Sequence, residues 1–138
     1  MVSSAVDWQL FAQPILRVDS CTKYYPQDYE LLIRDASGRV PLQQLQRLLG
    51  SEEGNYCFWG WKRNVLRPLM EEHQVGMPSY WINIDPVQLA FDSTWQFLQD
   101  FSCYRDTMMI EVTERPIQDA ATVVDLPVAI HQLHQLGY

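Results

Sequence analysis

The chain has 138 residues, of which 47% are hydrophobic and 20% charged, a composition typical of a domain with a packed core and not of a disordered chain. Its formal net charge of −7 disfavours nucleic-acid polymers and anionic membranes as partners, because both attract clustered lysine and arginine. No stretch approaches the roughly 18 apolar residues of a membrane span, and the first residues do not resemble a secretory signal. We therefore expect a cytoplasmic protein with no membrane partner.

The first elements in chain order are two strands and a short helix. Residues 10–18 and 28–34 have the composition of strands, and the segment between them, 20–27, is rich in turn-forming and polar residues. So short a connection predicts an antiparallel hairpin. A short helix then begins near Pro41, shows leucines at helical spacing, and ends at Gly50.

Helices and strands alternate along the remainder of the chain. Apolar residues recur every three or four positions over 56–73, which predicts a long helix with a kink or break at Pro68. Strands separated by helices favour parallel pairing with the helices outside, so the fold class is α/β. No internal repeat or linker divides the chain. The later elements are predicted as a strand at 80–85, a helix at 93–101, a strand at 108–113 and a helix at 127–136.

Three of these strands carry a carboxylate or amide on one face. Side chains alternate along a strand, and Glu30, Asn83 and Glu111 each fall on the side opposite the apolar residues. In an antiparallel sheet such a face simply meets water. If the strands are parallel neighbours with helices on the apolar face, however, the three side chains converge near the strands' carboxyl ends. Two carboxylates and an amide oxygen suit a hard cation such as Mg²⁺, Mn²⁺ or Ca²⁺.

Four segments, in the correct order and spacing, resemble the EAL-domain family of bacterial cyclic di-GMP phosphodiesterases. Residues 29–34, Tyr-Glu-Leu-Leu-Ile-Arg, resemble the family's Y-E-A-L-L-R strand, with two substitutions. Residues 11–15 resemble its opening F-x-Q-P-I strand, residues 82–89 its V-N-L-S-P-x-Q-L segment, and residues 111–114 its E-I-T-E strand. The resemblance covers the chain from about residue 11 to residue 137.

The resemblance implies the N-terminal half of a TIM-like (β/α)8 barrel with an antiparallel first strand, so that residues 1–138 form a single truncated EAL-like domain. It implies that Glu30, Asn83 and Glu111 bind Mg²⁺ or Mn²⁺. By the same resemblance, Gln13 and Arg34 contact cyclic di-GMP, and Glu114 anchors a loop near the metal.

The activity implied by the family is metal-dependent hydrolysis of a phosphodiester. In the family, a D-D-F-G motif, a later lysine and a glutamate complete the site after a helix ending in L-G-Y, and this chain ends at residues 136–138 with those letters. We therefore expect no appreciable hydrolysis by the chain alone. The alternative is a non-catalytic EAL-like module that binds a nucleotide or a protein partner. In either case a half-barrel leaves a strand edge open, so we expect a homo-oligomer or another chain to cover it.

Overall fold

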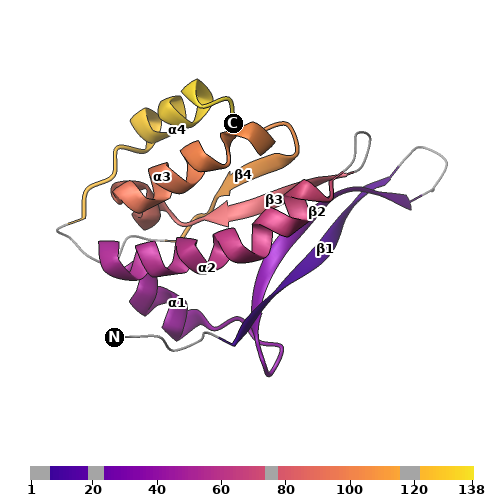
Figure 1. The fold of residues 1–138 in the computed structure, drawn as a ribbon, viewed down its shortest axis with the longest axis horizontal. Helices are drawn as coiled ribbons and strands as arrows, with labels where there is room; N and C mark the ends of the chain where they lie inside the picture. The colour runs from indigo at the N-terminus through magenta and orange to yellow at the C-terminus, as the bar shows by residue number, and fades with distance from the viewer. Residues whose placement is uncertain (1–6, 19–23, 74–77, 116–121) are drawn as a thin grey trace.

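The computed structural model describes residues 7–18, 24–73, 78–115 and 122–138. Four strands form one sheet in the order β1-β2-β3-β4, and the α-helices are arranged beside it (Figure 1). The strands are β1 (Trp8–Val18), β2 (Tyr24–Asp35), β3 (Ser79–Ile84) and β4 (Met108–Val112). The helices are α1 (Leu42–Leu49), α2 (Glu52–Glu71), α3 (Asp92–Asp100) and α4 (Leu126–Gln135), with short 3-10 helices η1 (Pro86–Ala90) and η2 (Ser102–Tyr104).

The sheet is mixed, as the sequence predicts. β1 and β2 pair antiparallel, whereas β2, β3 and β4 run parallel to one another. The α/β class and the antiparallel first pair are thereby confirmed, and closure of the sheet into a barrel remains a prediction. The hairpin is longer than expected: residues 24–27, predicted as part of the turn, continue β2 and pair with the end of β1 after a register shift at Ile15/Leu16. The longer ladder satisfies backbone groups that a loop would leave to water.

The helix α2 starts earlier than predicted and continues through its proline. Ser51 caps it, since the Ser51 hydroxyl accepts a 3.1 Å hydrogen bond from the backbone N–H of Gly54. Pro68 lies in the last turn, where only one intrahelical hydrogen bond is lost, and the helix continues to Glu71. Of the predicted kink or break at Pro68, the break is therefore wrong.

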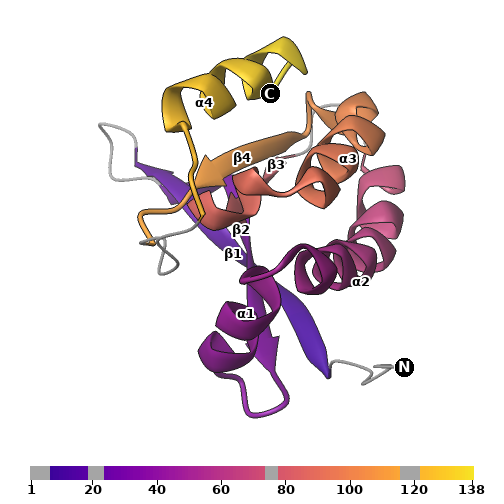
Figure 2. The ribbon, with the colours of Figure 1, turned by 90° about the vertical axis from the view of Figure 1, so that its left-hand side faces the viewer.

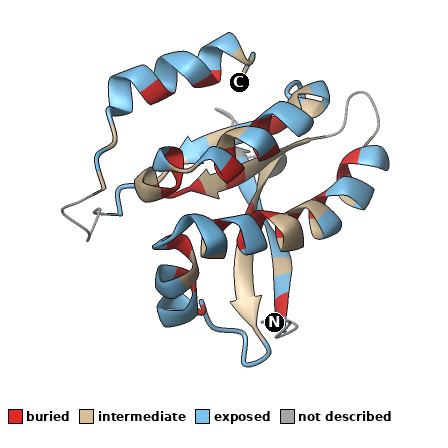
Figure 3. Cartoon of the chain, turned by 60° about the vertical axis from the view of Figure 1, so that its left-hand side comes forward, coloured by how far each residue is buried: buried red, intermediate tan, exposed pale blue. Residues whose placement is uncertain are grey.

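One face of the sheet packs against the helices and forms the core. Figure 2 shows α2 and α3 to one side of the strands, and Figure 3 marks buried positions on both strands and helices. The rings of Trp59 on α2 and Phe97 on α3 stack with centroids 4.1 Å apart, which fixes the two helices against each other. The buried strand residues are Trp8, Leu31, Ile82, Ile84 and Met108.

A buried polar network joins α2 to η1 and α3. The amide nitrogen of Asn55 donates to the hydroxyls of Ser93 (2.7 Å) and Thr94 (2.8 Å), and the Asn55 amide oxygen accepts from Gln88 Nε2 (3.1 Å). Gln88 Oε1 in turn accepts from the backbone N–H of Asp85 (2.9 Å). The network holds η1 in place and so fixes Asp85 at the carboxyl end of β3. Neither 3-10 helix was predicted from the sequence.

Within the described ranges, no helix combines the length and apolar character needed to cross a bilayer.

Candidate functional site

The three residues predicted as metal ligands lie on one face of the sheet, which we call the site face. Asn83 and Glu111 are direct partners in the parallel β3–β4 register, and Glu30 pairs with Trp81, two residues before Asn83. The Asn83 amide nitrogen donates a 2.8 Å hydrogen bond to Glu30 Oε1. The fold therefore brings together the three residues that alternation and the motifs selected.

The chemistry of this group fits a hard divalent cation. Glu30 and Asn83 are partly buried, while Glu111 is exposed. Because Asn83 donates through its nitrogen, its side-chain oxygen stays available, and two carboxylates with one amide oxygen are the donors that Mg²⁺ and Mn²⁺ prefer. No cluster of three or more His, Cys, Asp or Glu occurs in the part of the chain that the structure describes. The amide of Asn83 is thus needed to complete the set of three ligands.

The two residues predicted to contact a nucleotide lie on the same face of the sheet as Glu30. Gln13 is exposed and lies directly opposite Glu30 in the antiparallel β1–β2 register, so the two side chains share the site face. Arg34 lies four residues beyond Glu30 on the same strand and is partly buried. Its Nη1 donates to the backbone oxygen of Ile33 at 2.9 Å. Gln13 is therefore beside Glu30 across the sheet, whereas Arg34 lies farther along β2, near its carboxyl end.

Asp28 is a further carboxylate on the site face, but its oxygens are hydrogen-bonded to β3. Its two oxygens accept hydrogen bonds from the backbone N–H of Ser79 (3.0 Å) and from Trp81 Nε1 (2.9 Å). Both partners belong to the first half of β3, at the end of the strands away from Asn83. Asp28 thus holds β3 in register with β2, and Glu30 is the carboxylate of β2 that lies nearest Asn83.

The segment after β4 is anchored at Asp85. The Thr113 hydroxyl donates to Asp85 Oδ1 (2.7 Å), and Arg115 Nη1 donates to Oδ2 (3.2 Å). Glu114, between these two residues, is exposed, and its predicted role as a loop anchor stays a prediction. Asp85 occupies the serine position of the V-N-L-S-P pattern. That departure was the sequence feature that could have revealed a charged anchor here.

Sequence reasoning missed a buried lysine on α2. Lys62 is only 1% exposed, and its ammonium lies 5.4 Å from the ring centroid of Phe58 and 5.9 Å from that of Trp59. Burial lowers the pKa of Lys62 to about 8, and the negative charge of Asp85 partly opposes this shift. Lys62 stands four residues after Phe58 and four before Leu66, on the buried stripe of the helix. That spacing was the available signal.

The mixed sheet, its antiparallel first pair and the site face together define an EAL-like fold. No family model matches the chain, and no curated protein matches it. Several solved structures match it. A complex of Klebsiella pneumoniae BlrP1 with calcium and cyclic di-GMP is 20% identical over 95% of this chain, with a TM-score of 0.61. BlrP1 with FMN and cyclic di-GMP but no metal ions gives 18% identity and a TM-score of 0.59.

A manganese and cyclic di-GMP complex of the same protein at pH 6 covers 94% of this chain, with 18% identity and a TM-score of 0.56. At such identities the likeness is one of fold. This chain spans only about a third of the length of the BlrP1 chains, 32% to 33%.

Proposed function

We propose that the chain is the N-terminal half of an EAL-type cyclic di-GMP phosphodiesterase domain, whose site face binds a divalent cation and cyclic di-GMP. One observation carries the proposal: Asn83 is hydrogen-bonded to Glu30 and paired in register with Glu111. The BlrP1 complexes support it, because a protein of the same fold was solved with cyclic di-GMP and with calcium or manganese.

Five residues of the site face have a part in this proposal. Glu30, Asn83 and Glu111 hold Mg²⁺ or Mn²⁺, which in a complete domain polarises the phosphodiester and activates water. Arg34 has the planar guanidinium suited to a phosphate oxygen pair. Gln13 lies across the strand pair from Glu30, where its amide can hydrogen-bond to the nucleotide. This side of the sheet thus offers both cation ligands and polar groups for an anionic dinucleotide.

Exposed apolar residues on the same face support a covering partner. Phe11 (50% exposed) and Ile15 (37%) lie opposite Leu32 and Asp28 in the β1–β2 register, on the side of Glu30. Met109, 41% exposed, lies two residues before Glu111 on β4. Apolar side chains beside a polar site favour burial under further protein. In our proposal a second copy, or another chain, covers this face of the sheet.

A binding module without catalysis is the second candidate. The observation that favours it is the small ligand set: among the described residues, the site face offers Glu30 and Glu111 with the Asn83 amide. Two-metal hydrolysis uses a pair of cations that hold both the attacking and the leaving oxygen, and three ligands are few for two ions. We therefore expect the isolated chain to bind cyclic di-GMP and not to hydrolyse it.

Calorimetric titration of cyclic di-GMP into the purified chain, with Mn²⁺ and with a chelator, tests this function. Binding that requires Mn²⁺ and weakens at least tenfold in Glu30→Gln supports the proposal. Glu53→Gln is the matched control, because Glu53 is exposed at the start of α2, away from the site face. Equal affinity in Glu30→Gln and the parent chain contradicts the proposed site. Chromatography of the same samples distinguishes the two candidate functions, because it detects hydrolysis of cyclic di-GMP. Hydrolysis at an ordinary enzymatic rate would contradict the binding module.

A further inference from the structure

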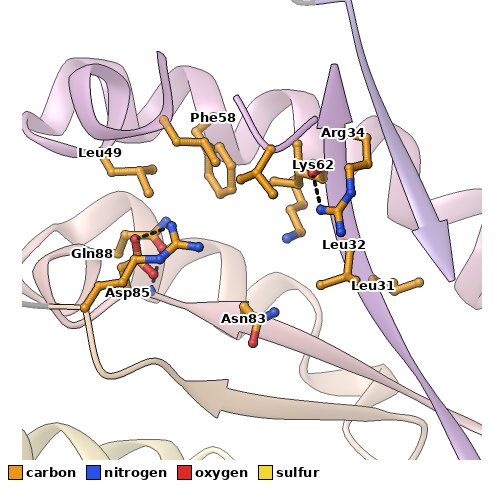
Figure 4. Close-up of a pocket in the computed structure, with 13 residues that line it drawn as sticks. Leu31, Leu32, Arg34, Leu49, Phe58, Lys62, Asn83, Asp85 and Gln88 are labelled. Carbon is orange, nitrogen blue, oxygen red and sulfur yellow. Dashed lines mark hydrogen bonds and ion pairs between the residues drawn. The ribbon is translucent and has the colours of Figure 1, made fainter. Parts of the chain in front are cut away.

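A concave feature lies where α1 and α2 meet the carboxyl ends of β2 and β3. It is a cavity of about 160 Å³ (Figure 4). Its charged lining residues are Lys62 from α2, Arg34 from β2, Asp85 after β3 and Arg115 after β4. Three basic side chains thus meet one acidic side chain, in a chain whose formal net charge is −7. The charged side chains of the cavity lining are therefore net positive, whereas the whole chain is net negative.

Lys62 is the most deeply buried of these cations. Its side chain extends from α2 into the cavity, toward the strands (Figure 4), and the residue is 1% exposed. The ion pairs within the described ranges are Arg63 with Asp100 and Arg115 with Asp85, so Lys62 pairs with no carboxylate there. The rings of Phe58 and Trp59 are its close neighbours. A buried ammonium that lacks a counter-charge is costly, and an anion in the cavity would offset that cost.

Asp85 does not provide this counter-charge at contact distance. Its two carboxylate oxygens already accept hydrogen bonds from the Thr113 hydroxyl and the Arg115 guanidinium. Asp85 acts on Lys62 only as a more distant negative charge. The remaining hydrogen-bonding capacity of Lys62 therefore faces the cavity.

We infer that this cavity is a binding site for a small oxyanion, a phosphate-sized or carboxylate group, with Lys62 as its principal cation. Arg34 contributes a second positive charge. Its Nη1 donates a hydrogen bond to the Ile33 carbonyl, and its other N–H groups can donate to an anion. The cavity is far smaller than a dinucleotide. The cavity adjoins the proposed nucleotide face, because Arg34 and Asn83 also line it, but its principal cation, Lys62, comes from α2 and has no part in the proposed function.

Nuclear magnetic resonance of the whole chain labelled with ¹³C-lysine tests the inference, because the sequence has only two lysines, Lys23 and Lys62. The probes are inorganic phosphate, acetate and chloride at matched ionic strength. We expect a saturable shift of the Lys62 side-chain signal with phosphate or acetate, and a rise of its pKa by about 1 or more when the anion is bound. The ratio of the two dissociation constants distinguishes a phosphoryl from a carboxylate site. No shift, or an equal shift with chloride, overturns the inference.

Thermal unfolding supplies an independent readout. Phosphate that binds only the folded chain raises its melting temperature in a saturable way. Lys62→Met keeps the length of the side chain and removes the ammonium, and we expect it to abolish that increase. Arg67→Met is the matched control, because Arg67 is an exposed cation on the same helix that does not line the cavity. An undiminished phosphate effect in Lys62→Met overturns the inference.

Discussion

The side-chain amide of Asn83 donates a 2.8 Å hydrogen bond to Glu30 Oε1 and thereby links two neighbouring parallel strands at the candidate metal site. We predict that Asn83→Asp lowers the free energy of unfolding in the presence of a chelator, because it places two carboxylates side by side. At this partly exposed position the loss should be on the order of 1 kcal/mol. Mn²⁺ should stabilise Asn83→Asp more than it stabilises the parent chain.

Denaturant titrations with and without Mn²⁺ check this prediction. Asn64→Asp, at an exposed position of α2, is the control and should respond to Mn²⁺ as the parent does. If Mn²⁺ stabilises Asn83→Asp no more than Asn64→Asp, then Asn83 does not face a cation site.

Lys62 should make the stability of the chain depend on pH in the alkaline range. Its pKa is about 8 in the folded chain against an ordinary 10.5, so between these values the unfolded chain holds a proton that the folded chain has released. The contribution of Lys62 to stability is therefore most unfavourable below pH 8 and improves as the pH rises to 10.5. We expect Lys62→Met to be more stable than the parent at pH 7, by up to about 3 kcal/mol.

Urea unfolding of both proteins across this range measures the effect, and the buffers should contain no phosphate. The difference in free energy should shrink steadily between pH 8 and 10.5. The other charged residues that line the cavity, Arg34, Asp85 and Arg115, are common to both proteins. A difference that stays constant with pH would show that Lys62 has an ordinary pKa.

The buried network around Asn55 predicts a large loss of stability on truncation. Asn55→Ala removes three buried hydrogen bonds and leaves Gln88 Nε2 without its acceptor. We expect the free energy of unfolding to fall by about 2–4 kcal/mol. Asn64→Ala, on an exposed face of the same helix, should change it by less than about 0.5 kcal/mol. Similar small effects for both variants would argue against the network.

Two glycines of α2 should respond in opposite directions to alanine. A Cβ added at Gly54 would overlap the backbone carbonyl of Leu48, so Gly54→Ala must push α1 and α2 apart. We expect a loss of about 1–3 kcal/mol. A Cβ at Gly60 meets no atom within 4 Å, and Gly60→Ala should stabilise the helix by about 0.5–1 kcal/mol. Chemical denaturation of the two variants measures both changes in the free energy of unfolding. If both variants were stabilised, the close approach of α1 and α2 at Gly54 would be refuted.

Periodicity and motifs were sufficient for the sheet and the site face. Alternation along β2, β3 and β4 placed Glu30, Asn83 and Glu111 on one side, because strand side chains alternate whatever the tertiary environment. The short connection also predicted the antiparallel first pair. Predictions from the local sequence pattern were wrong where tertiary structure determines the outcome. Pro68 suggested a break, yet its place in the last turn of α2 makes the loss small.

The cavity could not be predicted, because five separate segments form it. Lys62 was one polar residue within an apolar helix pattern, and its burial depends on the tertiary arrangement of the segments that line the cavity. Asp85 reads as the start of a turn before Pro86, and only the tertiary structure shows its carboxylate bound by Thr113 and Arg115. Contacts between residues some 30 positions apart leave no trace in local spacing.

The most direct test of the central claim is paramagnetic broadening by substoichiometric Mn²⁺ in the ¹⁵N spectrum of the whole chain. The proposed site predicts the strongest broadening at the backbone amides of Glu30, Asn83 and Glu111, and its loss in the double variant Glu30→Gln, Glu111→Gln. Broadening centred on other acidic residues, or unchanged in the double variant, would contradict a metal site on this face of the sheet.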